Sequence, residues 1–306
     1  MTAPPVVRVT SIRKTYGQTV AVDDVSFSVE PGEIFGLIGP NGAGKTTTME
    51  CVEGLRRPDR GQIEVLGFDP IRDGRRLQPL IGVQLQEAQL QKRIKVWEAV
   101  DLWATLYDTV LDGNRLLDQL GLRDKREAWF MNLSGGQKQR LFIALALINQ
   151  PELVFLDELT TGLDPQARHA IWELVRSIRD RGQTVFLTTH LMEEAERLCD
   201  RVAIIEHGRI VDHDTPAGLV DKHCPERTVL VSTTHEDAAT RFAQLPSVDT
   251  VTEDNDRHTI RGRGDNLVTE VIHCLSAHNI RVSEFRTEQP TLEDVFLTLT
   301  GHSIRD

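Results

Sequence analysis

Long hydrophobic runs are missing from this sequence. The longest uninterrupted apolar stretch spans residues 141–148 of a 306-residue chain, whereas a membrane-spanning helix needs roughly 18 to 20 apolar residues. Residues 1–5 are short and proline-rich, and no apolar segment typical of a signal peptide follows them. We therefore expect a cytoplasmic protein, so that any membrane spans it works with must belong to another polypeptide.

Cysteine pairs and an excess of positive charge are also missing. The four cysteines are far apart and form no C-x-x-C pair, which argues against a zinc site or a disulfide framework. The formal net charge is −11, and nucleic-acid binding requires clustered lysine and arginine to neutralise phosphates. We therefore expect no nucleic-acid partner, and we interpret the short basic segment 72–76 as a solvated loop.

A glycine-rich string is present at residues 39–46. It reads Gly-Pro-Asn-Gly-Ala-Gly-Lys-Thr and fits the phosphate-binding pattern G-x-x-x-x-G-K-[ST]. The apolar run 34–38 predicts a buried strand before it, and residues 46–54 predict a helix whose N-terminus faces the phosphates. Lys45 is placed to reach the β- and γ-phosphates of a nucleotide, and Thr46 to bind Mg²⁺. The predicted ATP-binding residues are Gly39, Pro40, Asn41, Gly42, Ala43, Gly44, Lys45, Thr46 and Thr47.

Two acidic residues follow a predicted apolar strand at residues 153–156. Asp157 suits the ligand shell of a magnesium ion, because hard cations prefer oxygen ligands. Glu158 can point to the other side and polarise an attacking water as a general base. Paired acids at a strand end are often only solvated, but the phosphate-binding string upstream favours the catalytic interpretation.

A second glycine-rich turn, Leu-Ser-Gly-Gly-Gln, occupies residues 133–137. Ser134 stands 89 residues after Lys45 (134 − 45). The turn is predicted to open a helix, so its backbone amides form another anion-binding site. A chain that binds one nucleotide does not obviously need two such sites.

The two strings, in this order, resemble the ATP-binding subunit of ATP-binding cassette (ABC) transporters. In that family two subunits pack head to tail, and each ATP lies between the phosphate-binding loop of one and the serine-glycine turn of the other. The resemblance therefore implies a partner that is a second ATP-binding subunit, in the simplest case a second copy of this chain. It implies ATP-binding roles across that interface for Ser134, Gly135, Gly136, Gln137 and Asp164.

Three further positions follow from the same resemblance. Tyr16 falls where the family stacks an aromatic ring on adenine, and a surface tyrosine in a strand is the alternative. Gln86 matches the glutamine that contacts Mg²⁺ and the γ-phosphate, although Gln84 and Gln89 are close enough to be alternatives. His190, after a predicted strand, matches the histidine that contacts the γ-phosphate. The catalytic residues are then Glu158, His190 and Gln86, and the Mg²⁺ ligands are Thr46, Gln86 and Asp157.

Strand and helix patterns predict the fold. Residues 6–35 alternate polar and apolar as antiparallel strands do, and residues 136–206 alternate between helix and strand, which indicates a largely parallel sheet. With the resemblance, this predicts an α/β fold, in which a P-loop ABC cassette over residues 1–215 has a parallel core sheet, an antiparallel β subdomain and a helical subdomain at about 87–135. Residues 216–306 show the order β-α-β-β-α-β, which predicts a small α+β ferredoxin-like domain.

The carboxy-terminal string at residues 290–296 also resembles one branch of the family, the ATPase subunits of bacterial multidrug and antibiotic exporters of the daunorubicin-resistance type. This implies an ATP-hydrolysing motor that uses ATP and Mg²⁺ to export a drug-like or other small substrate. Its membrane half would be a separate integral-membrane permease, which would hold this chain at the inner face of the cell membrane. The alternative is a soluble non-transport ABC ATPase that acts as a regulator or assembly factor. The carboxy-terminal domain would either bind a small regulatory ligand or extend the dimer interface.

One position departs from the family pattern. The family has proline directly after the catalytic glutamate, and Leu159 stands there instead. Proline would fix the backbone φ angle and remove one N–H donor. We expect Leu159→Pro to change ATP turnover less than severalfold, measured as steady-state phosphate release, and a larger change would show that this position controls hydrolysis.

Overall fold

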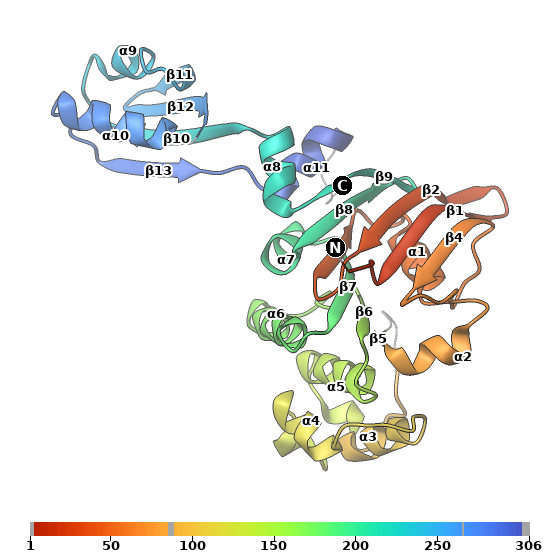
Figure 1. The fold of residues 1–306 in the computed structure, drawn as a ribbon. Helices are drawn as coiled ribbons and strands as arrows, with labels where there is room; N and C mark the ends of the chain where they lie inside the picture. The colour runs from red at the N-terminus through yellow and green to blue at the C-terminus, as the bar shows by residue number, and fades with distance from the viewer. Residues whose placement is uncertain (1–2, 85–88, 265, 302–306) are drawn as a thin grey trace. The chain divides into compact units, whose positions relative to one another are not determined.

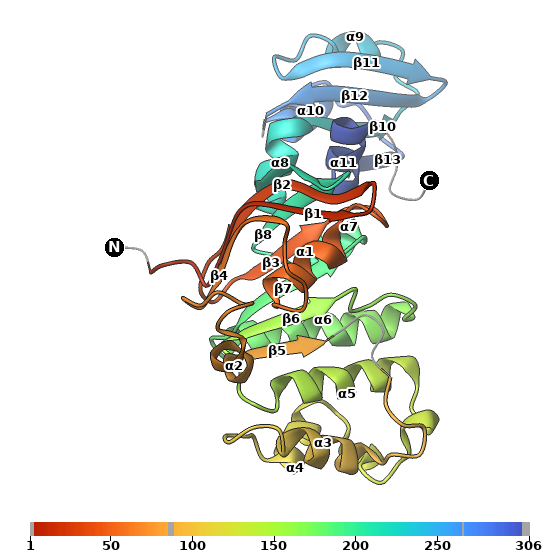
Figure 2. The same ribbon diagram turned by 90° about the vertical axis from the view of Figure 1, so that its right-hand side faces the viewer.

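The computed structural model describes residues 3–84, 89–264 and 266–301. The chain divides into two compact units, one ending at Pro216 and the other beginning at Ala217. Both can be followed by colour in Figure 1, and Figure 2 gives the view at right angles. Each unit has its own hydrophobic core, so each is described by itself.

The first unit is built on a six-stranded sheet in the order β5-β6-β7-β3-β8-β9. Neighbouring strands are parallel except β8 and β9, which are antiparallel. All residues of β3, β6 and β7 are buried, as expected for strands covered on both faces. The strands are β3 (Ile34–Ile38), β5 (Ile81–Gln84), β6 (Leu153–Asp157), β7 (Thr184–Thr189), β8 (Arg201–Glu206) and β9 (Arg209–Asp214).

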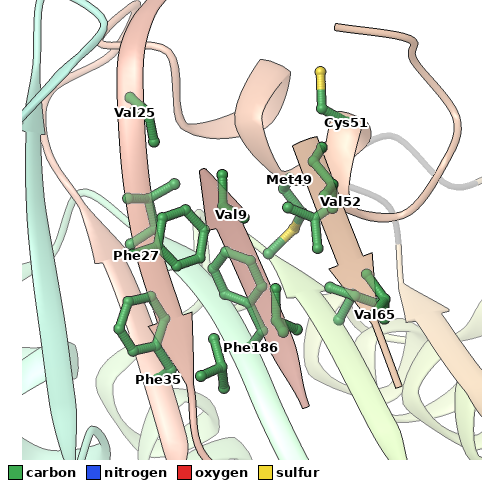
Figure 3. Close-up of a cluster of buried hydrophobic side chains, with 14 of the residues drawn as sticks. Val9, Val25, Phe27, Phe35, Met49, Cys51, Val52, Val65 and Phe186 are labelled. Carbon is green, nitrogen blue, oxygen red and sulfur yellow. The ribbon is translucent and has the colours of Figure 1, made fainter. Parts of the chain in front are cut away.

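A three-stranded antiparallel sheet, in the order β2-β1-β4, packs with this core. It is formed by β1 (Val7–Tyr16), β2 (Thr19–Val29) and β4 (Arg60–Val65). In Figure 3 the ring of Phe27 lies beside those of Phe35 and Phe186, with ring centroids 5.3 and 5.6 Å away. Such aromatic pairs add to the stabilisation from buried area, so they tie the two sheets together.

Helices complete the first unit. The helix α1 contacts strands of both sheets, and its Met49 and Val52 point into the shared core (Figure 3). The amphipathic α6, at 16 residues, is the longest helix in the described part of the chain. Within the described residues, no helix is long and apolar enough to cross a membrane. The helices are α1 (Lys45–Val52), α2 (Gly74–Leu77), α3 (Val96–Ala104), α4 (Gly113–Gln119), α5 (Gly135–Leu147), α6 (Pro165–Asp180) and α7 (Met192–Leu198).

The basic segment 72–76 is not wholly a solvated loop. It enters the short helix α2, whose Leu77 is buried. The guanidinium group of Arg76 lies 4.5 Å from the centroid of the Phe68 ring. The charge pattern did not predict this helix because the one residue that the helix buries, Leu77, lies just outside the basic segment.

The second unit is an antiparallel sheet in the order β11-β12-β10-β13. With the helices α9 and α10 it has the expected β-α-β-β-α-β order. The helix α8, which precedes this pattern, was not expected from the sequence. The elements are α8 (Pro216–His223), β10 (Glu226–Ser232), α9 (Ala238–Phe242), β11 (Val248–Asp254), β12 (Arg257–Arg263), α10 (Leu267–Ala277), β13 (Glu284–Glu288) and α11 (Leu292–Thr300).

Glu53 is an acidic residue buried directly after α1, with 7% of its surface exposed. Neither of its carboxyl oxygens has a hydrogen-bond partner among the described residues. Burial, with smaller contributions from Asp157 and Glu50, raises the pKa of Glu53 from 4.5 to about 8. Between these two values the folded protein holds a proton that the unfolded chain releases, so the free energy of unfolding falls as the pH rises.

We expect Glu53→Gln to become progressively more stable than the unchanged protein as the pH rises from 5 to 8, because glutamine keeps the shape and cannot ionise. The measurement is the urea midpoint by tryptophan fluorescence, which reports the first unit because all four tryptophans precede residue 216. Glu64→Gln, at an exposed position of β4, is the control. A difference that does not change with pH would contradict the prediction.

Candidate active site

The glycine-rich string forms the turn between β3 and α1. The amide of Gly39 donates to the carbonyl of Thr189 (3.3 Å), and that of Gly208 donates to the carbonyl of Ala43 (2.9 Å). A Cβ atom on Gly44 would lie 2.4 Å from the carbonyl oxygen of Ala21. The backbone of this turn is therefore pressed against neighbouring strands, and glycine is required at the close approach.

A hollow of about 290 Å³ opens at this turn. Inside it, the Lys45 side chain is 4% exposed and its Nζ donates to the carbonyls of Gly39 (2.9 Å) and Pro40 (3.0 Å). The same Nζ lies 3.6 Å from Glu158 Oε1. Burial lowers the pKa of Lys45, while the charge of Glu158 opposes that effect. The hollow is lined by Ala21, Asn41, Gly42, Gly44, Lys45, Thr46, Thr47 and Glu158.

Glu158 is held in an unusual backbone conformation at the end of β6. Its φ angle is 46°, a left-handed value that is uncommon for residues other than glycine. Its amide donates to both the carbonyl and the hydroxyl oxygen of Thr188, each at 3.2 Å, which stabilises this conformation. Glu158 Oε1 also lies 3.5 Å from His190 Nδ1. The contact with His190, with the charge of Lys45, holds the pKa of Glu158 below its usual value despite burial.

Asp157 is buried beside Glu158 and accepts a hydrogen bond from the Thr188 hydroxyl. Burial raises the pKa of Asp157, while Thr188, Lys45 and the Thr46 side chain oppose that shift. The Asp157 carboxyl and the Thr46 hydroxyl are thus close together beside the phosphate-binding turn. Oxygen donors of this kind, completed by water and phosphate oxygens, fit the usual environment of Mg²⁺.

Of the two other predicted residues, the structure describes Tyr16 but not Gln86. Tyr16 is 41% exposed at the end of β1, where the guanidinium group of Arg56 lies 5.2 Å from its ring centroid. It does not line the hollow described above. Gln86 lies outside the described residues, and of its two alternatives Gln84 is buried on β5 whereas Gln89 is exposed.

The serine-glycine turn begins α5 and belongs to a different part of the surface. Ser134 Oγ accepts a hydrogen bond from the amide of Gln137 (3.3 Å), and Gln137 Oε1 accepts one from the amide of Ser134 (3.0 Å). Asp164 likewise caps α6 by accepting from the amide of Ala167 (2.9 Å). A Cβ on Gly136 would lie 3.2 Å from the Cβ of Ala167, so the two helix starts are neighbours. None of these residues lines the hollow at Lys45.

Thr188 is a residue of this cluster that sequence reasoning missed. It is fully buried on β7 and its side chain joins Asp157 to the backbone of Glu158. A signal was present, because a threonine directly after the apolar run 185–187 needs a hydrogen-bond partner when it is buried. The sequence did not identify that partner, since Asp157 is the last residue of a neighbouring strand and Glu158 follows it.

Comparison with known proteins was consistent with this geometry. The family model of the ABC transporter matches residues 22–161. Curated relatives include the Nod factor export ATP-binding protein I of Rhizobium meliloti, 39% identical over 97% of this chain and 88% of that protein. The protein of the same name from Paraburkholderia xenovorans is 38% identical over 96% of this chain and 97% of its own length. The chain belongs to the ABC transporter family. It is an ATP-binding, ATP-hydrolysing subunit of a transporter.

Solved structures agree with this assignment. The ATP-binding subunit of an ABC transporter is 29% identical and has a TM-score of 0.64, covering 71% of this chain and 92% of that one. A dimeric ATP-binding cassette bound to ADP and phosphate is 25% identical, with a TM-score of 0.62 over 68% of this chain and 98% of its own. The predicted P-loop cassette fold is therefore confirmed.

We expect Gly44→Ala to weaken ATP binding more than Gly42→Ala does. Both glycines have positive φ angles, which cost an L-residue about 1–2 kcal/mol. Only the Cβ at position 44 would also collide with the carbonyl of Ala21, since the space around Gly42 is open. The measurements are the Kd of a fluorescent ATP analogue and the Tm of each variant. Equal losses in the two variants would contradict the role given to the close approach at Ala21.

Proposed function

We propose that this chain is the ATP-hydrolysing motor of an exporter whose membrane permease is a separate polypeptide. The observation that carries the proposal is the convergence of Lys45, Glu158 and His190 beside the phosphate-binding turn: Glu158 Oε1 lies 3.6 Å from Lys45 Nζ and 3.5 Å from His190 Nδ1. We assign the cassette to residues 1–215 and treat residues 216–306 as its extension.

Hydrolysis requires each of these groups at the γ-phosphate. Lys45 binds the β- and γ-phosphate oxygens, exchanging part of its contact with the turn for them. Glu158 accepts a proton from water as that water attacks the γ-phosphorus, and the bond to the bridging oxygen breaks to give ADP and phosphate. His190 donates a hydrogen bond to a γ-phosphate oxygen. Bound Mg²⁺ would neutralise phosphate charge, held by Thr46 and Asp157, with Gln86 as a further ligand.

The second nucleotide-binding surface supports a dimer of two such chains. Ser134 and Asp164 cap two helices whose first turns are neighbours, yet neither residue lines the hollow at Lys45. A second copy packed head to tail would bring its Ser134 turn to that hollow and close it. A known dimeric cassette of the same fold is consistent with this arrangement.

The direction of transport rests on similarity. The curated relatives are named as Nod factor export proteins, and the carboxy-terminal string resembles drug exporters of the daunorubicin-resistance type. We infer export of a drug-like or other small substrate, with the chain bound to the inner face of the membrane through its permease. Tyr16, exposed at the end of β1, remains our candidate for stacking on adenine.

We expect Glu158→Gln to bind ATP with a Kd close to that of the unchanged protein and to hydrolyse it about 10²–10⁴-fold more slowly, the usual effect of removing a general base. ATP should then hold it as a dimer. Phosphate release and light scattering after size exclusion measure the two effects. Glu173→Gln, on the exposed face of α6, is the control. Normal turnover in Glu158→Gln would remove Glu158 as the base.

A bait experiment tests the partner. Glu158→Gln loaded with ATP is used to capture proteins from detergent-solubilised cells, with Glu158→Gln carrying Ser134→Arg as the matched control that cannot close. Recovery of one multi-span membrane protein only with the first bait supports the exporter. Recovery of soluble partners or nucleic acid instead would favour the regulator alternative.

A further inference from the structure

Glu194 is a buried acidic residue that the proposed hydrolysis does not use directly. Glu194 lies in the first turn of α7 and is 1% exposed. Its Oε1 accepts two hydrogen bonds, from Thr160 Oγ1 (2.8 Å) and from Trp172 Nε1 (2.9 Å). A buried acidic group is costly unless it is hydrogen-bonded, so both donors stabilise its position. The three residues come from α7, from the loop after β6 and from α6 (Figure 1).

Two of these residues are close in sequence to the hydrolysis site. Thr160 follows Glu158 by two positions, and Glu194 follows His190 by four. The two segments therefore touch twice, once where Glu158 Oε1 lies 3.5 Å from His190 Nδ1 and once through the hydrogen bond from Thr160 to Glu194. The hydrogen bond from Thr160 to Glu194 thus adds a second side-chain contact between the two segments, beside the bonds that hold the Glu158 amide to Thr188.

Thr160 also organises the loop that leads to α6. The amide of Thr161 donates to the carbonyl of Glu158 (3.3 Å), and the amide of Leu163 donates to the carbonyl of Thr160 (3.2 Å). Thr160 is thus the junction of two successive turns, and Asp164 follows directly as the cap of α6. A side-chain contact that fixes Thr160 therefore holds the loop between Glu158 and Asp164.

We propose that Glu194 is a positioning residue for ATP hydrolysis, which acts through Thr160 to fix the Glu158 carboxyl against His190. The proposal rests on the function proposed above, in which Glu158 and His190 act at the γ-phosphate. Trp172 keeps the Glu194 oxygen in place from α6. Without the Thr160 hydroxyl, the loop that carries Glu158 loses its side-chain contact with α7, and misplacement of a catalytic group by about 1 Å can slow an enzyme by about 10²-fold.

The test uses Thr160→Val, which removes the hydroxyl and nearly preserves the volume. Its matched control is Thr184→Val, because Thr184 is also buried and its Oγ1 accepts one hydrogen bond, from the amide of Gly32 (2.9 Å), at the start of β7. We expect similar losses of Tm in the two variants. Only Thr160→Val should lower kcat, by about tenfold, with its KM for ATP within twofold of the unchanged protein.

A second pair of variants separates positioning from folding. The amide oxygen of Glu194→Gln can accept the same two hydrogen bonds, whereas Glu194→Ala cannot, so Glu194→Gln should keep most of the kcat that Glu194→Ala loses. Equal kcat in Thr160→Val and Thr184→Val, or a loss confined to KM, would overturn the inference and leave the proposed function standing. If the protein without any substitution showed no ATPase activity, both the inference about Glu194 and the proposed function would be overturned.

Discussion

The site depends on the contacts of one buried ammonium group, that of Lys45. It is held by two carbonyls of its own turn and by the carboxyl of Glu158. A buried cation needs such partners because the charge is otherwise costly to remove from water. The turn therefore already surrounds a charge where a polyphosphate would bind, and the same charge contacts the carboxyl of Glu158, the residue we propose as the general base. Changes at Lys45 would disturb Glu158 as well as the nucleotide.

The parallel strands explain why these groups meet. The carboxyl ends of β3, β6 and β7 lie along one edge of the sheet, and they are followed by the phosphate-binding turn, by Glu158 and by His190. This edge is the usual place for ligands in open α/β sheets. The hydroxyl of Thr188, on the central one of these strands, joins the acidic pair to β7. The register of these strands thus brings the phosphate-binding turn, Glu158 and His190 to the same edge of the sheet.

Sequence reasoning succeeded where the signal was local. The buried strand at 34–38, the glycine turn after it and the strand that ends at Asp157 each follow from a short pattern of residues. Thr188 and Glu194 were missed because their roles depend on contacts with distant segments, which no spacing in the sequence reveals. The helix α8 was missed because its single fully buried residue, Leu219, gives a weak periodic signal. The assignment of Gln86 stays a prediction, since it lies outside the described residues.

The reciprocal cap at Ser134 and Gln137 leaves the serine hydroxyl able to act a second time. Ser134 Oγ accepts a hydrogen bond from the amide of Gln137, and Gln137 Oε1 accepts one from the amide of Ser134. A hydroxyl that accepts one hydrogen bond still has its own proton to donate. The cap that begins α5 therefore fixes the position of the hydroxyl without using that proton. In the dimer proposed above, a phosphate oxygen held by the other subunit would accept it, so closure would add a hydrogen bond at Ser134 and break none there.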